Sequence, residues 1–506
     1  MFVRVLSFAL LGIEAIPVAV EVDLCPGIPC MEIVGLPDTA VREARERVRS
    51  ALRNGGWGFP AQRITVNLAP AHTRKMGAGF DLAIAVGVLA AAGFIPAGAL
   101  EGVSLVGELA LDGSLRPVRG ALVMAQAART AGCACLITAI PDAPEAALAG
   151  GIVHGAHTLS AVVRHLNGES LLPAAVPNPA SDEGATCALD LADVKGQLIA
   201  RRALEIAAAG SHNLLMTGPP GTGKSLLARC LPGILPALDS EEAMEVSRIH
   251  SAAGTLLGGR LMRDRPYRAP HHSASRSALL GGGNPLRPGE VTLAHRGVLF
   301  LDELPEWGRD QLESLRQPLE EGRISLARVH GQGVFPAQPM LLAAANPCPC
   351  GYLGDETHPC TCPPGVIVQY QSRLSGPLLD RFDLQVYMAP VPYQDLIDSG
   401  ADSAAEPSQV VRARVQQARQ RQRERFGLSG FCNAHMTPSQ VRRHCPLPAG
   451  GKELMRQAFE VLGLSLRAHD RILKVARTIA DLAGADRIEL PHLAEALQYR
   501  TRGFRP

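Results

Sequence analysis

The chain has 506 residues, of which 46% are hydrophobic, enough for about three globular domains with cores of their own. Lys and Arg total 50 and Asp and Glu total 48, a formal net charge of +2, so any nucleic-acid contact has to come from a local patch. Aromatic residues make up only 4%, which disfavours base stacking as the main binding mode. Every run of 18 apolar residues is interrupted by a charge or a proline, so we expect no membrane partner.

The first twenty residues are apolar enough to resemble a secretory signal peptide. Glu14, Pro17 and Glu21 fall where the apolar segment and the cleavage site would lie, so we interpret this stretch as a pair of buried strands. The 12 cysteines do not form an even framework in a small fold, because four crowd into residues 348–362 and the rest are scattered. This pattern indicates a reducing, cytoplasmic location and one metal site.

Strand and helix signals alternate along an N-terminal domain that we place at residues 1–167. We expect a strand at 64–68, a buried helix at 79–92, a strand at 103–111 that turns at Asp112-Gly113, and a helix at 121–131. Residues 168–186 contain three prolines, few apolar residues and no periodicity, which predicts a linker.

The next domain is predicted at residues 187–392. It begins with a helix at 198–209 and a short strand at 213–217, and further strands are expected at 298–301 and 340–345. Such short, wholly apolar strands are typical of a parallel sheet that is covered on both faces. From about residue 393 the strand signals stop, and residues 393–506 are expected to be helical.

Residues 218–225 form a complete phosphate-binding loop between a predicted strand and a predicted helix. The run is Gly218, Pro219, Pro220, Gly221, Thr222, Gly223, Lys224 and Ser225, which fits the pattern G-x-x-x-x-G-K-[ST]. Glycines let backbone N–H groups converge on phosphates, and the helix adds its positive end. We expect Lys224 to bind the outer phosphates of ATP and Ser225 to ligate Mg²⁺. The alternative is a glycine-rich turn that matches by chance.

Two other predicted strands end in polar residues suited to ATP hydrolysis. Asp302 and Glu303 follow the strand at 298–301, and the carboxyl ends of parallel strands face the ligand crevice. Asp302 is therefore expected to hold Mg²⁺ and Glu303 to polarise the attacking water. Asn346 ends the strand at 340–345 and could hydrogen-bond that water or the γ-phosphate. The alternatives are a helix N-cap for the acids and a simple turn for Asn346.

The order of these motifs resembles that of an AAA+ ATPase. Asp193–Gln197 (DVKGQ) precedes the phosphate loop, and Leu378–Asp383 (LLDRFD) follows Asn346. With RAPHHSAS at 268–275 and NPCPCG at 346–351, the whole chain is similar to the magnesium-chelatase-like ComM/YifB family. The resemblance implies an α/β fold: an AAA+ P-loop NTPase core with a helical lid, preceded by a Lon-protease-like α+β domain of the ribosomal S5 domain 2 type.

The same resemblance assigns roles to two arginines. Arg381, in the LLDRFD run, would act in trans as a finger on the γ-phosphate of a neighbouring subunit. Arg467 lies where the lid-borne sensor arginine is expected, with Arg471 one turn later as its competitor and an exposed helical arginine as the plain alternative. A finger supplied in trans requires adjacent subunits, and ring closure then predicts a homo-hexamer.

In the N-terminal domain the resemblance places Lys75–Ala83 where Lon-type proteases carry their nucleophilic serine. Gly77 occupies the serine position, and Gly120–Met124 has no lysine where the dyad lysine is expected. A nucleophile needs both a hydroxyl and a base within reach. We therefore expect a scaffold or DNA-handling domain and not a peptidase.

The cysteine-rich insert at 348–362 contains two C-x-C pairs, Cys348 with Cys350 and Cys360 with Cys362. Four thiolates can close a tetrahedral Zn²⁺ site. The loop between the pairs has little to bury, and a metal would give it order. The alternatives are free thiols, a disulfide, or His358 in place of one ligand.

Two segments are candidates for DNA contact. Residues 322–335 predict a β-hairpin, which the resemblance places as the pre-sensor-1 hairpin in the pore of a hexameric motor. Arg328, His330 and Gln332 near its tip would contact DNA phosphates, with an ordinary surface hairpin as the alternative. The predicted helix at 410–426 carries Arg412, Arg414, Arg419, Arg421, Arg423 and Arg425 beside an apolar stripe. For this helix we favour an amphipathic packing role over DNA contact by one arginine row.

The resemblance implies an ATP-driven motor that moves single-stranded, duplex or branched DNA through a ring, and in particular branch migration of heteroduplex DNA in natural transformation. One alternative is a magnesium-chelatase-type motor that remodels a protein partner for metal insertion. Another is a nucleotide-gated scaffold. DNA-stimulated ATPase activity would distinguish the first function from the other two.

Overall fold

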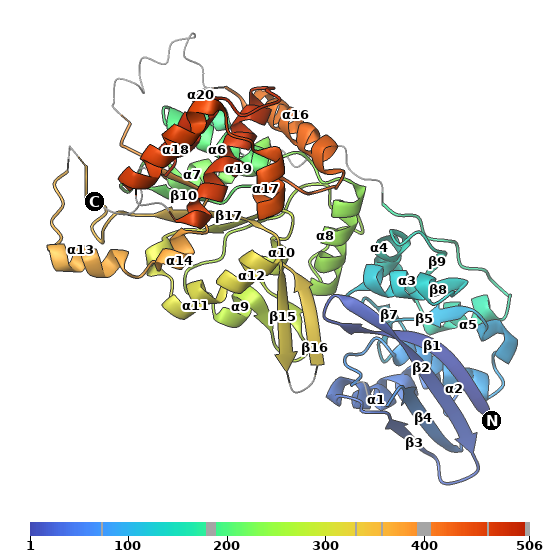
Figure 1. Cartoon of the computed structure of the whole chain (residues 1–506). Coiled ribbons are helices and arrows are strands. Elements are labelled where there is room, and N and C mark those ends of the chain that lie inside the picture. Colours follow the sequence, from blue (N-terminus) through green and yellow to red (C-terminus); the bar gives the residue numbers. More distant parts are fainter. Residues whose placement is uncertain are drawn as a thin grey trace.

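The computed structural model describes residues 1–71, 74–178, 189–328, 331–355, 358–391, 406–462 and 465–500, without the side chains of 327, 328, 331, 332 and 462. A seven-stranded sheet lies in the N-terminal third, a five-stranded sheet in the middle, and a group of helices in the C-terminal part (Figure 1). The predicted α/β architecture is therefore confirmed.

The N-terminal sheet has the strand order β3-β4-β2-β1-β5-β8-β9. Its strands are β1 (Phe2–Leu11), β2 (Glu14–Cys25), β3 (Cys30–Val34), β4 (Arg63–Ala69), β5 (Val103–Leu105), β8 (Cys135–Ala139) and β9 (Val153–Ala156). The helices are α1 (Thr39–Asn54), α2 (Asp81–Ala91), α3 (Ala121–Thr130), α4 (Ala143–Ala147) and α5 (Leu159–Leu166). Because β1 and β2 pair antiparallel along their whole length, the interpretation of the apolar N-terminus as a strand pair is confirmed.

The predicted strand at 103–111 is split into β5 and β6 (Glu108–Leu109), which pairs with β7 (Leu115–Arg116). The reason lies at Gly107, whose N–H donates to the carbonyl of Gly79 at 2.9 Å and whose carbonyl accepts from Leu82 at 3.1 Å. These bonds tie the chain to the start of α2, so Gly107 is not available to a continuous ladder.

The two positions compared with a protease dyad carry no catalytic groups. Gly77 has φ +84° and its N–H donates to Asp38 at 3.1 Å, while residues 121–124, in the segment compared with the dyad lysine, are buried apolar side chains. Lys75 lies nearby, but its ammonium is buried and donates to the carbonyl of Pro70. This burial lowers the pKa of Lys75.

The first part of the predicted linker is held against the N-terminal sheet. The N–H of Ala175 donates to Val153 at 2.7 Å, and the N–H of Leu172 donates to the ring of His165 at 3.0 Å. Residues 179–186 lie outside the described residues.

The five-stranded sheet is wholly parallel, in the order β11-β14-β17-β10-β18. Its strands are β10 (Leu214–Thr217), β11 (Tyr267–Arg268), β14 (Val298–Leu301), β17 (Met340–Ala345) and β18 (Leu384–Tyr387). Every residue of β10, β14 and β17 is buried, and successive side chains enter two different core clusters. Two-sided burial explains why these strands are continuous apolar runs.

Helices cover both faces of this sheet. One face packs against α6 (Leu198–Gly210), α7 (Lys224–Ile234) and the C-terminal helices α16 (Ser408–Phe426), α17 (Pro438–His444), α18 (Ala449–Leu462), α19 (Leu466–Leu482) and α20 (Leu490–Gln498). The other face packs against α9 (Arg276–Leu280), α10 (Glu290–Leu293), α11 (Arg309–Ser314) and α14 (Gly376–Leu379). Among the helices in the described ranges, none combines the length and apolar character needed to cross a bilayer.

The remaining elements are α8 (Ser240–Ala253), the short hairpin of β12 (Gly281–Gly282) and β13 (Arg287–Pro288), α12 (Arg316–Glu321), α13 (Pro364–Gln371) and the hairpin of β15 (Arg323–Arg328) and β16 (Gly331–Pro336). The β15–β16 hairpin extends from the core beside the N-terminal domain (Figure 1). The register pairs Arg328 with Gly331, which confirms the predicted hairpin.

Candidate active site

The phosphate loop joins β10 to α7 as predicted. Gly221 and Gly223 have φ values of +80° and +87°, a left-handed region that favours glycine. Nothing lies within 4 Å of a Cβ added at either position, so backbone conformation and not space requires glycine there. The Nζ of Lys224 donates to the carbonyls of Gly218 and Pro219, both at 2.7 Å. Burial lowers the pKa of Lys224 to about 8.

Ser225 and Asp302, the two predicted Mg²⁺ ligands, lie in direct contact at the end of the sheet. The hydroxyl of Ser225 donates to Oδ2 of Asp302 at 2.7 Å, while Oδ1 accepts from the backbone N–H of Glu303 at 2.9 Å. The indole of Trp307 donates to the Asp302 carbonyl at 2.9 Å and fixes this turn. A hydroxyl and a carboxylate are hard oxygen donors, so the pair fits Mg²⁺.

Glu303 lies at the start of the turn after β14 in a left-handed backbone conformation, with φ +49°. Such a conformation costs about 1–3 kcal/mol for a residue other than glycine and is common at functional sites. The carboxylate is 57% exposed, and its Oε2 lies 3.2 Å from Nδ1 of His272. The sequence reasoning gave His272 no role. The available signal was its place in the RAPHHSAS run at 268–275, which was used only for the family resemblance.

Asn346 directly follows β17, which lies between the strands that precede the phosphate loop and the acidic pair. The register pairs Thr217 with Ala345 and Leu301 with Ala343. The phosphate loop, the acidic pair and Asn346 therefore lie together at the carboxyl ends of the strands.

Gln197 supports the phosphate loop from outside the sheet. Its side-chain amide donates to the carbonyls of Thr222 at 3.3 Å and Ala389 at 2.7 Å.

Arg381 lies at the opposite end of the same sheet, where the strands begin. It precedes β18, whose first residue Leu384 pairs with Leu214, whereas the phosphate loop follows Thr217. Four residues of strand span about 13 Å, so Arg381 and the loop of its own chain are at opposite ends. Arg381 is only 5% exposed and pairs with Glu320 at 2.5 Å.

The two candidate lid arginines lie on this same side. Arg467 is 67% exposed, and its guanidinium is 3.9 Å from Glu320, the partner of Arg381. Arg471 is more buried and lies 3.5 Å from the carboxylate of Asp383. Both arginines thus lie near Arg381 and not beside the phosphate loop of their own chain.

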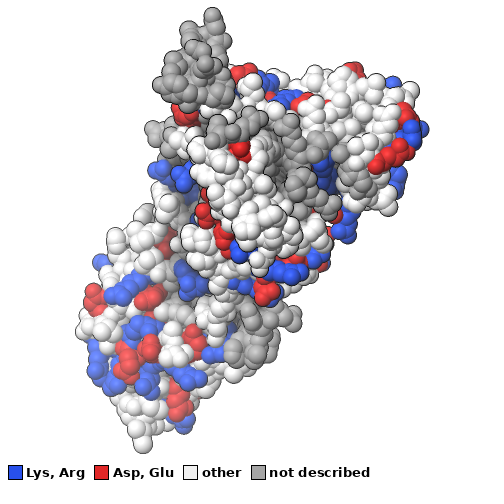
Figure 2. Space-filling view, turned by 90° about the vertical axis from the view of Figure 1, so that its left-hand side faces the viewer, with Lys and Arg blue, Asp and Glu red and all other residues white. Residues whose placement is uncertain are grey.

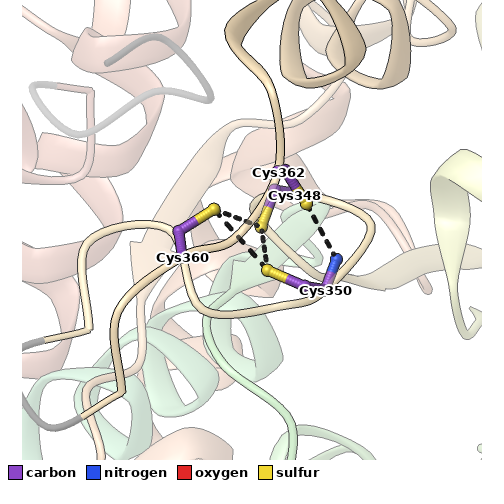
Figure 3. Close-up of side chains that lie close together, drawn as sticks. All are labelled: Cys348, Cys350, Cys360 and Cys362. Atoms are coloured by element: carbon purple, nitrogen blue, oxygen red, sulfur yellow. Dashed lines mark hydrogen bonds between the residues drawn. The ribbon is translucent and has the colours of Figure 1, made fainter.

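The four cysteines of the insert come together in space (Figure 3). Their Sγ atoms all lie within 4.8 Å of one another, and Cys348, Cys350 and Cys360 are separated by 3.3–3.7 Å. Sulfur atoms around a tetrahedral Zn²⁺ with bonds of about 2.3 Å lie about 3.8 Å apart, so the donor set fits this ion. Backbone N–H groups, chiefly that of Tyr352, lower the pKa of Cys350 to about 6. His358 is not part of the cluster, and its ring lies 5.2 Å from that of Tyr352.

The candidate DNA contacts differ in what the structure describes. The hairpin is present, but His330 and the side chains of Arg328 and Gln332 lie outside the described residues. On the face shown in Figure 2, Lys and Arg side chains are interspersed with Asp and Glu and do not form one basic patch.

Most arginines of α16 form hydrogen bonds or ion pairs with other segments of the same chain. Val411, Val415 and Ala418 are buried, which confirms the amphipathic helix. Five arginines contact partners in other segments: Arg414 with Glu205 at 2.6 Å, Arg419 with the Ala208 carbonyl at 2.7 Å, Arg421 with Asp486 at 3.2 Å, Arg423 with Asp239 at 3.7 Å and Arg425 with Asp481 at 2.5 Å. These contacts favour the packing role over DNA binding.

Comparison with known proteins identifies the family. The family model "Magnesium chelatase, subunit ChlI" matches residues 190–396, "Subunit ChlI of Mg-chelatase" matches 20–142, and "Magnesium chelatase, subunit ChlI C-terminal" matches 405–500. The chain is 47% identical to "Competence protein ComM" of Haemophilus influenzae over 504 residues, covering 98% of this chain and 97% of the relative. The chain belongs to the ComM/YifB family of magnesium-chelatase-like AAA+ ATPases.

Other relatives extend the comparison. YifB of Salmonella typhimurium, described as uncharacterized, is 45% identical, with 97% of this chain and 96% of the relative covered. "DNA helicase MCM8" of Bos taurus is 25% identical over 186 residues, which is 37% of this chain and 19% of the relative. The membership predicted from the motif order is thus confirmed over nearly the full chain.

Proposed function

We propose that the protein hydrolyses ATP at the carboxyl ends of the strands of the five-stranded sheet. The amides of the phosphate loop and Lys224 bind the phosphates, and Ser225 and Asp302 hold Mg²⁺, which when bound neutralises charge on the β- and γ-phosphates. Glu303 accepts a proton from the attacking water, and Asn346 orients that water or the γ-phosphate. The meeting of Ser225 with Asp302 at 2.7 Å supports this arrangement.

His272 is a positioning residue in this proposal. Its ring nitrogen, 3.2 Å from Glu303, restricts a carboxylate that is otherwise exposed at the end of β14. A general base must lie within hydrogen-bond reach of the proton that it takes. Restricting Glu303 therefore favours turnover more than it favours ATP binding.

The active unit is proposed to be a homo-hexamer in which Arg381 serves the neighbouring subunit. The observation that carries this proposal is the position of Arg381 at the amino end of the strands, opposite the phosphate loop of its own chain. Since Arg467 shares Glu320 with Arg381, we place its sensor role at the same subunit interface. Heterologous contacts that repeat around a closed ring supply every site with a finger.

DNA is the proposed substrate of the motor, with branch migration of heteroduplex or branched DNA as the proposed work. The similarity to a competence protein and the β15–β16 hairpin support this choice. The test is the ATPase rate of the purified protein without DNA, with single-stranded DNA and with a branched junction. Stimulation by DNA supports the motor, and an unchanged rate with all DNA substrates rejects it.

A magnesium-chelatase-type motor is the second candidate, because three family models described as magnesium chelatase subunits match the chain. Such a motor would hydrolyse ATP without DNA stimulation and respond instead to a protein partner that receives the metal. A nucleotide-gated scaffold would bind ATP with very slow turnover in every condition.

A further inference from the structure

The cysteine cluster is continuous with the candidate ATP site. Asn346 is separated from Cys348 by a single residue, Pro347, whose carbonyl accepts from the side chain of Gln371 at 3.1 Å. Cys348 itself is fully buried. A displacement of the cluster therefore reaches Asn346 through two peptide units.

The turn that carries Cys348 and Cys350 also lies against the phosphate loop. The N–H of Gly351 donates to the carbonyl of Cys348 at 3.0 Å, which closes the turn that carries Cys350. A Cβ added at Gly351 would lie 2.6 Å from Cδ of Pro220, so the backbone of this turn is pressed against the loop. The turn from Asn346 to Gly351 thus begins at one candidate site residue, Asn346, and ends against another part of the site, Pro220 of the phosphate loop.

The second C-x-C pair closes the insert over this turn. Cys360 lies 3.7 Å from Cys348 and 3.5 Å from Cys350, and the N–H of Cys350 donates to Sγ of Cys362 at 3.4 Å. The residues between the two pairs, 351–359, include few apolar side chains, so hydrophobic burial contributes little to holding the pairs together. A cation bound by all four thiolates would supply that link, with release of the thiol protons.

We propose that a thiophilic divalent cation, Zn²⁺, at Cys348, Cys350, Cys360 and Cys362 holds the 346–351 turn on the phosphate loop and so sets the position of Asn346. ATP hydrolysis then depends on the occupancy of the zinc site. The inference rests on the ATPase proposed above and gives the cysteine insert a role in that site.

The test compares the wild type with Cys360→Ser/Cys362→Ser, which removes the two ligands that lie farther from Asn346 along the sequence. A matched control, Cys25→Ser/Cys133→Ser, removes two cysteines outside the cluster. Zinc content is measured after dialysis, amide hydrogen exchange is followed in residues 218–225 and 346–353, and ATP affinity and turnover are determined without DNA. We expect about one zinc per chain in the wild type and control, and less than about a tenth in the cluster variant. Exchange in both segments should rise about tenfold and turnover should fall about tenfold in that variant.

Two results would overturn the inference. A wild type that binds no added zinc chloride and has four freely reactive thiols would exclude the metal site. Zinc in the wild type combined with unchanged exchange and turnover in the metal-free variant would exclude the coupling.

If the cluster variant does not fold, zinc is removed from the wild type with a chelator that spares Mg²⁺ and is then restored. Faster exchange that reverses on restoring zinc supports the inference, and unchanged exchange contradicts it. None of these measurements uses DNA, so a protein that DNA fails to stimulate would reject the proposed motor without deciding the role of zinc. If the wild type has no turnover at all, exchange and ATP affinity still test the coupling.

Discussion

Mixing two inactive variants tests whether Arg381 serves a neighbouring subunit. Arg381→Ala keeps the phosphate loop but removes the finger, and Lys224→Ala keeps the finger but removes the phosphate-binding lysine. Each variant alone should be inactive. In a mixed ring, an interface is intact wherever an Arg381→Ala subunit faces the finger of a Lys224→Ala subunit.

The expected effect on turnover exceeds the effect on folding. Arg381 pairs with a carboxylate of Glu320 that is 54% exposed, so loss of that pair costs about 1 kcal/mol or less. Its other contacts are with the carbonyls of Pro377 and Arg316, and their loss adds about 1–3 kcal/mol. A trans finger contributes a factor of about 10³–10⁵ to turnover, which is about 4 kcal/mol or more of the barrier.

In a random equal mixture, about a quarter of the interfaces combine an intact loop with an intact finger. We therefore expect about a quarter of wild-type ATPase activity, against less than about one per cent for each parent. Arg456→Ala, which removes an exposed ion-paired arginine from α18, serves as the control and should retain full activity. Subunit exchange is verified with fluorescently labelled chains. A mixture as inactive as its parents, with exchange demonstrated, would refute the trans role.

Four further predictions address other parts of the chain. Glu303→Gln should bind ATP normally and turn over about 100-fold more slowly, whereas Lys224→Ala should also lose affinity; normal turnover of Glu303→Gln would remove Glu303 from its role. His272→Ala should lower kcat about tenfold with little change in KM, and His272→Asn should restore part of the rate. His271→Ala serves as the control, and equal rates for His272→Ala and wild type would contradict the positioning role. Replacing Arg328, His330 and Gln332 together by Ala should preserve basal ATPase activity and ring assembly, but abolish DNA stimulation and flatten the salt dependence of DNA binding; branch migration at the wild-type rate would exclude the hairpin. Burial raises the pKa of Asp142 to about 7, so this carboxyl ionises at a lower pH in the unfolded chain than in the folded protein. The free energy of unfolding therefore falls as the pH rises from about 4 to 7. Asp142→Asn should therefore raise Tm more at pH 8 than at pH 5, and equal shifts at the two pH values would exclude the buried charge.

The strands that are buried on both faces could be predicted from the sequence alone. β10, β14 and β17 are buried on both sides, so their apolar runs stand out without knowledge of their partners. The contact between Ser225 and Asp302 was also predictable, because parallel strands bring their carboxyl ends to one edge.

Long-range partners could not be predicted in the same way. β11 has only two residues, so neither its pairing with β14 nor the approach of His272 to Glu303 has a periodic signal. Arg414 and Arg425 lie beside a recognisable apolar stripe, but their partners Glu205 and Asp481 are 209 and 56 residues away. Charge pairs at such separations follow from the packing of helices and not from local pattern.

The N-terminal domain contacts two elements of the AAA+ core, the β15–β16 hairpin and α8. At the turn between β1 and β2, a Cβ added at Gly12 would lie 3.2 Å from Phe335, a fully buried residue of β16. The end of α8 is bound as well, because the hydroxyl of Ser251 donates to Glu145 at 2.6 Å and its carbonyl accepts from Gly120 at 3.1 Å. Deleting the N-terminal domain would therefore expose Phe335 and leave α8 without these partners. A truncated protein that loses DNA stimulation would not show that the N-terminal domain binds DNA, so substitutions at the hairpin tip are the sharper test.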